Sequence, residues 1–138
     1  MKDMKVLIVE DNEFKLETTV SYLKELGITN ISYVKSLNGG LAELSQAEKN
    51  GKQYDLLILD MQLPQYEAER GHICSDGGIR ILKEVTHRRY NTKVIINTSE
   101  HMKKEKYDIY PNVIGYVKYD SCVYQLQDFK VLINSFVN

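Results

Sequence analysis

The sequence has no apolar run long enough to span a membrane and no run of basic residues. No stretch of the 138 residues approaches the roughly 20 apolar positions that a transmembrane helix needs. The formal net charge is −1, and Lys and Arg are never clustered in the way that marks a nucleic-acid interface. We therefore expect neither a membrane span nor a nucleic-acid partner.

Cysteine is also scarce. Cys74 and Cys122 lie far apart and in no metal-binding spacing, which favours a reducing compartment and indicates no evident cysteine chemistry. Residues 1–5 run directly into an apolar segment, without the longer apolar region of a signal peptide. These features predict a cytoplasmic location.

The composition is that of one ordinary globular domain. The residues are 43% hydrophobic and 27% charged, and the length allows a substantial buried core. We find no internal repeat, low-complexity tract or linker, and the residues after Lys118 suffice for one helix. We expect a single domain over residues 1–138, with no output domain.

Strand-like and helix-like segments alternate along the chain. Residues 13–26 place Phe14, Val20, Leu23 and Leu26 at mostly helical spacing, and Gly27 follows as a stop. Between residues 98 and 118 the periodicity is poor, so any helix there is short or irregular. The alternation of strand-like and helix-like segments predicts an α/β fold with a parallel sheet and right-handed crossovers. The expected strands lie near 4–9, 30–35, 55–60, 93–98 and 113–118, and further helices at 37–49, 78–89 and 120–137.

Four of these apolar strands end on polar side chains. The strand near 4–9 ends on Glu10 and Asp11, and the strand near 55–60 ends on Asp60. The strand near 93–98 ends on Thr98, which a serine follows, and the strand near 113–118 ends on Lys118. Because ligands bind outside the carboxyl ends of strands in an open parallel sheet, these side chains should meet in one place.

Three neighbouring carboxylates repel one another unless a cation lies between them. A hard divalent cation with oxygen ligands, above all Mg²⁺, suits such a shallow site. With a metal, a lysine and a hydroxyl beside a carboxylate oxygen, the arrangement favours phosphoryl transfer to an aspartate. Singly, each side chain could be a surface or helix-capping residue.

Four segments together resemble the receiver domain of response regulators in two-component signalling. They are Lys5–Asn12, Asp55–Pro64, Val94–Ser99 and Gly115–Lys118. Each is a weak motif alone, but four in this order span essentially the whole chain. The resemblance implies a flavodoxin-like (βα)5 fold, with a five-stranded parallel sheet in the order 2-1-3-4-5 and helices on both faces.

The resemblance also implies a role for each strand-end residue. Asp60 would be the phosphoacceptor, Thr98 the switch hydroxyl and Lys118 the phosphate-binding lysine. Gln62 and Glu100 would occupy positions that tune the lifetime of the acyl phosphate.

For Mg²⁺, the resemblance implies four ligands. Asp11 would bind directly and Glu10 through water, and Asp60 and the backbone carbonyl of Gln62 would be further ligands.

One departure from the family pattern is an insertion of roughly ten residues, Gln65–Asp76, beside Asp60. Loops of this kind carry specificity or gating more often than stability. A lid or partner-facing role and an inert surface decoration both stay open. His72 and Cys74 within it are weak candidates for a metal site.

Other departures surround Lys118. Tyr119 replaces the proline that usually follows the lysine in a cis peptide, so a trans bond is expected here, or a strained one. Gly115 stands where the family has its switch aromatic, and Tyr116 lies one place nearer to the lysine. Either a bulge restores the aromatic or the usual coupling is missing.

We therefore expect a phosphoacceptor signalling domain that is not an enzyme, apart from catalysing its own phosphorylation and dephosphorylation. Its expected partners are a histidine kinase or a histidine phosphotransfer protein and an unknown downstream effector. The alternatives are a pseudo-receiver that acts without phosphorylation and an aspartate-nucleophile phosphatase. The phosphatase reading is the weaker, because Gln62 stands where such enzymes need a second aspartate.

Overall fold

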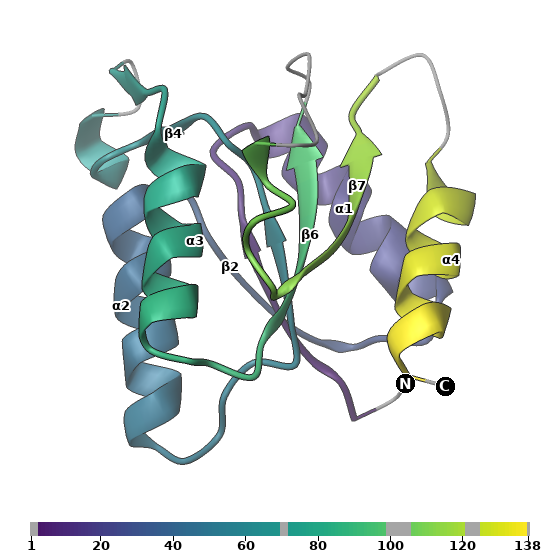
Figure 1. Cartoon of the computed structure of the whole chain (residues 1–138). Coiled ribbons are helices and arrows are strands. Elements are labelled where there is room, and N and C mark those ends of the chain that lie inside the picture. Colours follow the sequence, from purple (N-terminus) through teal and green to yellow (C-terminus); the bar gives the residue numbers. More distant parts are fainter. Residues whose placement is uncertain (1–2, 70–71, 99–105, 121–124, 138) are drawn as a thin grey trace.

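The centre of the molecule is a five-stranded parallel sheet in the order β2-β1-β3-β6-β7 (Figure 1). The computed structural model describes residues 3–69, 72–98, 106–120 and 125–137. Counted along the main sheet, this is the 2-1-3-4-5 order that the resemblance to receiver domains implies. Its strands are β1 (Lys5–Val9), β2 (Asn30–Val34), β3 (Leu56–Leu59), β6 (Lys93–Thr98) and β7 (Val113–Lys118).

Helices cover both faces of this sheet. Helices α1 (Glu13–Glu25) and α4 (Leu126–Val137) pack on one face, and α2 (Leu37–Lys49) and α3 (Gly77–His87) on the other (Figure 1). None of the helices in the described ranges is long and apolar enough to cross a membrane.

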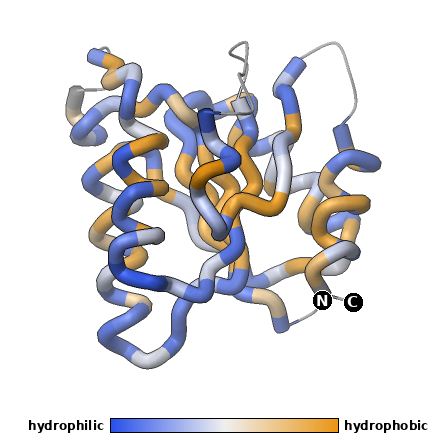
Figure 2. The backbone as a smooth tube through the Cα atoms, in the orientation of Figure 1, coloured by the Kyte–Doolittle hydropathy of each residue, from blue (hydrophilic) through white to orange (hydrophobic). Residues whose placement is uncertain are grey.

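Alternation along the central strands divides the core between the two faces. Leu7 and Val9 of β1 contribute to the cluster under α2 and α3, whereas Val6 and Ile8 contribute to the cluster under α1 and α4. In Figure 2, hydrophobic residues run through the central strands and along parts of the covering helices, whereas the outer turns are mainly hydrophilic. Burying both faces of β1 and β3 fixes their register, and therefore the height at which Glu10 and Asp60 leave the sheet.

Helix α1 differs from the expected pattern in its first turn. Phe14, expected among its core positions, is 63% exposed. The buried face instead carries Lys15, Leu16, Thr19, Tyr22 and Leu23. The prediction was wrong because it followed the apolar residues alone, whereas this face buries a lysine at one end.

The insertion after Pro64 folds into local structure of its own. Strands β4 (Leu63–Pro64) and β5 (Ile73–Cys74) pair antiparallel, with the 3₁₀ helix η1 (Glu67–Glu69) between them. These short strands were not predicted, because two-residue strands leave no periodicity in a sequence.

Strand β7 contains the bulge that the sequence left open. Val94 pairs with Val113, but Ile95 pairs with Gly115, so β7 has one extra residue at this point. A Cβ atom at Gly115 would lie 2.3 Å from Leu132 Cδ2 of α4, so a larger residue here would require the Leu132 side chain to move. Tyr116 then packs on the opposite face of the sheet, beside Tyr107.

The segment before β7 contains no regular helix where it is described. Residues 107–112 form turns and a bend, in line with the poor periodicity. Ser99, Glu100 and Cys122 lie outside the described residues. The last helix begins at Leu126 in the structure, and positions 121–124 of the expected 120–137 segment are also outside the described ranges.

Candidate functional site

Three carboxylates meet at the carboxyl ends of β1 and β3. One oxygen each of Glu10, Asp11 and Asp60 lies within 4.8 Å of the others. Glu10 is buried, whereas Asp11 and Asp60 are partly exposed. The three acids lie together at the strand ends, as the sequence predicts. Among the described residues, they form the group of acidic side chains that could hold a metal ion.

The backbone around Asp60 is tightly fixed. Its N–H donates to the Val9 carbonyl at 3.2 Å, and its Oδ1 accepts from the Met61 N–H at 2.7 Å. A Cβ atom at Gly78, in the first turn of α3, would lie 2.6 Å from the Asp60 carbonyl oxygen. The start of α3 therefore packs directly on this loop, where the Gly78 N–H also donates to the Met61 carbonyl at 2.9 Å.

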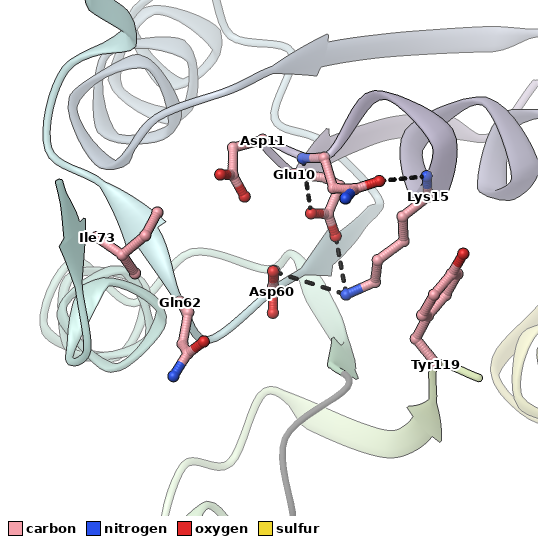
Figure 3. A pocket seen from close by; sticks show the side chains of 8 residues that line it. Glu10, Asp11, Lys15, Asp60, Gln62, Ile73 and Tyr119 are labelled. Carbon is pink, nitrogen blue, oxygen red and sulfur yellow. Dashed lines mark hydrogen bonds and ion pairs between the residues drawn. The ribbon is translucent and has the colours of Figure 1, made fainter. Parts of the chain in front are cut away.

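A lysine enters the same cluster from α1. Lys15 Nζ lies 2.9 Å from Glu10 Oε1 and 3.6 Å from Asp60 Oδ2. It also donates to the backbone carbonyl of Asn97 at 2.8 Å. Its side chain is only 4% exposed, and Figure 3 shows the ammonium lying between the carboxylates of Glu10 and Asp60.

Burial controls the protonation of Glu10. Desolvation, followed by the negative charge of Asp60, raises the pKa of Glu10 from 4.5 to about 8, although Lys15 acts in the opposite direction. Both protonation states of Glu10 are therefore populated near neutrality. A divalent cation would favour the ionised form and displace the proton.

The donor set fits Mg²⁺ in its chemistry. When Glu10 is ionised, three carboxylates and one ammonium leave two negative charges uncompensated, which one divalent cation would balance. Gln62 lines the same pocket as the acids, which keeps its carbonyl as a candidate fourth ligand.

The acids lie in a pocket of about 240 Å³. Ile73 of β5 forms part of its wall, so the insertion reaches the site (Figure 3). Ile73 is 45% exposed, and the hairpin thus places an apolar side chain at the mouth of an acidic pocket. The described lining residues are Glu10, Asp11, Asn12, Lys15, Asp60, Gln62, Ile73 and Tyr119.

The two remaining predicted residues occupy neighbouring strand ends. Thr98 pairs in register with Lys118, and the Tyr119 N–H donates to the Thr98 carbonyl at 2.9 Å. Thr98 is buried and Lys118 is exposed. Neither belongs to the described lining of the pocket, and the 118–119 peptide bond is trans.

Sequence reasoning missed Lys15. The available signal was its helical spacing with two other buried positions of α1, Thr19 and Tyr22, which places a lysine on the inward face. It was missed because lysine at a helix start is normally solvated.

Comparisons with known proteins agree with this fold and site. The family model described as response regulator receiver domain matches residues 6–113. A curated relative, hybrid signal transduction histidine kinase G of Dictyostelium discoideum, is 28% identical over 135 residues. That alignment covers 98% of this chain but only 4% of the kinase, so the chain corresponds to a small part of it.

Solved structures support the same fold. A two-component response regulator from Cytophaga hutchinsonii is 13% identical, with a TM-score of 0.71 and coverage of 97% of this chain and 99% of that one. The Mn²⁺-bound form of response regulator Rcp1 is 23% identical, with a TM-score of 0.68 and coverage of 97% and 94%. At these identities the likeness shows the fold alone. From the family match over most of its length, the chain belongs to the response regulator receiver domain family.

Proposed function

We propose that Asp60 accepts a phosphoryl group from a phosphohistidine donor, in a reaction that depends on Mg²⁺. The observation that carries this proposal is the convergence of Glu10, Asp11 and Asp60 at the ends of two buried strands. Receiver domains act in phosphorelay signalling, and this chain keeps the carboxylates that such chemistry needs. The donor is a histidine kinase or a histidine phosphotransfer protein.

In the proposed step, an oxygen of Asp60 attacks the phosphorus atom while the bond from phosphorus to the imidazole nitrogen breaks. The imidazole leaves with the bonding electron pair and then takes up a proton. Bound Mg²⁺ would neutralise charge on the phosphoryl oxygens. Asp60 Oδ1 is held by the Met61 N–H, so Oδ2 is the freer oxygen for attack.

Thr98 and Lys118 are proposed to contact the phosphoryl group from the neighbouring strand ends. The signal would then pass to an effector protein through the surface around Thr98. Hydrolysis of the acyl phosphate would return the domain to its resting state, and the chain would catalyse no other reaction. The proposed location is the cytoplasm, where small phosphodonors and kinases meet such domains.

The Mn²⁺ named in the Rcp1 structure supports a divalent cation at this site. The acid cluster supports the same assignment, because its oxygens are the ligands that Mg²⁺ prefers.

The test is incubation with Mg²⁺ and phosphoramidate, followed by intact mass measurement. Wild type should gain one phosphoryl group and Asp60→Asn none. Asp55→Asn is the matched control, because Asp55 flanks the other end of β3 and should leave the gain unchanged. No gain in wild type would favour a phosphorylation-independent pseudo-receiver, and sustained turnover of unrelated phosphate esters a phosphatase.

A further inference from the structure

We infer that Lys15 is a second phosphate-facing cation of this site, supplied by α1, in addition to Lys118. It would hold the negative charge of the phosphoryl group on Asp60. This inference rests on the proposed function, because it assigns a role in the phosphorylation of that aspartate.

The anchoring of Lys15 does not depend on Asp60. Its ammonium is held by the Asn97 carbonyl at 2.8 Å and by Glu10 at 2.9 Å, and the Tyr119 ring centroid lies 5.2 Å away. The contact with Asp60 Oδ2 is the longest of the ionic contacts, at 3.6 Å. Phosphorylation of Asp60 would therefore leave this ammonium in place. Its remaining N–H would still be available to the phosphoryl group on Asp60.

Without a role for its charge, a lysine at position 15 would lower the stability of the fold. A lysine that is 4% exposed loses most of its hydration. It also lies in the first turn of α1, where its N–H bonds to the Asn12 side chain and where the helix dipole favours an anion. An aliphatic side chain would fill this place without either cost, so its charge is better explained by the anions that it faces.

Tyr119 links this lysine to a departure near Lys118. Where the family usually has a proline, this chain has a tyrosine whose ring lies beside the Lys15 ammonium (Figure 3). Lys118 itself is exposed and makes no side-chain hydrogen bond or ion pair with a described residue. In the described structure, the cation that contacts Asp60 is Lys15.

The test compares Glu10→Gln with the double variant Glu10→Gln/Lys15→Met. Position 10 carries no charge in either protein, so their difference reports the loss of the ammonium, and Met keeps an unbranched side chain only one atom shorter than that of Lys. Three quantities are measured: phosphoryl gain from phosphoramidate at saturating Mg²⁺, affinity for beryllofluoride as a phosphoryl mimic, and Mg²⁺ affinity by calorimetry.

If Lys15 faces the phosphoryl group, its removal should lower the phosphorylation rate and the beryllofluoride affinity at least about tenfold. Mg²⁺ affinity should stay the same or increase, because a neighbouring positive charge opposes the metal. A merely structural role would weaken Mg²⁺ and beryllofluoride binding together, and that result would overturn the inference. Equal rates and affinities in the two proteins would overturn it as well.

Lys35→Met is the matched control for loss of one positive charge near α1. Lys35 pairs with Glu13 on the surface and is absent from the described pocket lining, so all three quantities should be unchanged. The beryllofluoride measurement needs no phosphotransfer. A wild type that binds beryllofluoride but gains no phosphoryl group would overturn the proposed function, while the comparison of the two variants would still decide the role of Lys15.

Discussion

The acid side and the lysine side of this site are built differently. On the acid side, β1 and β3 are buried on both faces and hold Glu10, Asp11 and Asp60 at their ends. On the lysine side, β7 is an edge strand with a bulge, and its final residue, Lys118, is exposed. The two sides are therefore constrained to different degrees.

This difference shows that the acids and the cation that contacts Asp60 are positioned by different kinds of element. The acids depend on two central strands, whose register a packed core fixes. A cation can reach Asp60 from any element that borders the pocket, and here α1 supplies one through Lys15. The positions of the acids therefore depend on the packed core, whereas the cation that contacts Asp60 comes from a helix beside the sheet.

The largest effect that we predict is the response of the acid side to pH. Burial raises the pKa of Glu10 to about 8 in the folded state, so its contribution to stability is fully present below about pH 4.5. It is lost as pH rises to about 8. Without divalent cations, the free energy of unfolding should fall by up to about 1.4 kcal/mol per pH unit across this window.

Urea denaturation of wild type and Glu10→Gln over pH 5–8 measures this effect, with the difference between the two proteins reporting Glu10. Glu17→Gln, an exposed change on α1, should keep the wild-type slope. Saturating Mg²⁺ should flatten the slope, because the metal binds the ionised carboxylate. A wild-type slope equal to that of Glu10→Gln would show that burial does not raise this pKa.

The second prediction concerns the contact between α3 and the Asp60 loop. A Cβ at Gly78 would lie 2.6 Å from the Asp60 carbonyl oxygen and 2.7 Å from Met61 Cα, both backbone atoms. Gly78→Ala should lower the free energy of unfolding by about 1–3 kcal/mol. It should also slow phosphorylation, because the loop must move.

Gly77→Ala is the matched comparison, because it makes the same change one residue earlier in α3. Its nearest contact is 3.0 Å to Leu63 Cβ, so the required shift is smaller. Thermal unfolding of both variants checks the order, and a Gly77→Ala variant that is the less stable of the two would contradict it.

Much of the acid side could be predicted from the sequence. An apolar run such as Leu56–Leu59 predicts a buried strand, and the Asp60 that follows it predicts where that strand ends. The strand order followed from the resemblance. The hairpin β4–β5 could not be predicted, since two-residue strands have no periodic pattern, and the bulge near Gly115 was one of two alternatives that the sequence left open. Lys15 was missed for another reason: its burial depends on Glu10 and on the Asn97 carbonyl, which are brought together only in the folded chain.

The third prediction tests the bulge on the lysine side. Gly115→Ala places a Cβ against the flexible end of Leu132, so the neighbour can partly give way and the cost should be about 1 kcal/mol. Leu132→Val removes the clashing atoms, so adding Gly115→Ala to that variant should cost less. Denaturant unfolding of the four proteins in this double-mutant cycle measures the coupling. Additive costs would mean that the clash is relieved elsewhere.

The smallest effect should come from Lys118 on metal binding. Its side chain is exposed and outside the described pocket lining, so solvent screens its charge from the acids. Lys118→Met should change Mg²⁺ affinity less than about twofold, whereas Asp11→Asn, which removes a proposed direct ligand, should lower it at least about tenfold. Isothermal titration at fixed ionic strength measures both. If Lys118→Met instead binds Mg²⁺ several times more tightly, the Lys118 ammonium must lie near the metal in the wild type. The acid side and the lysine side would then interact more strongly than the exposed Lys118 side chain indicates.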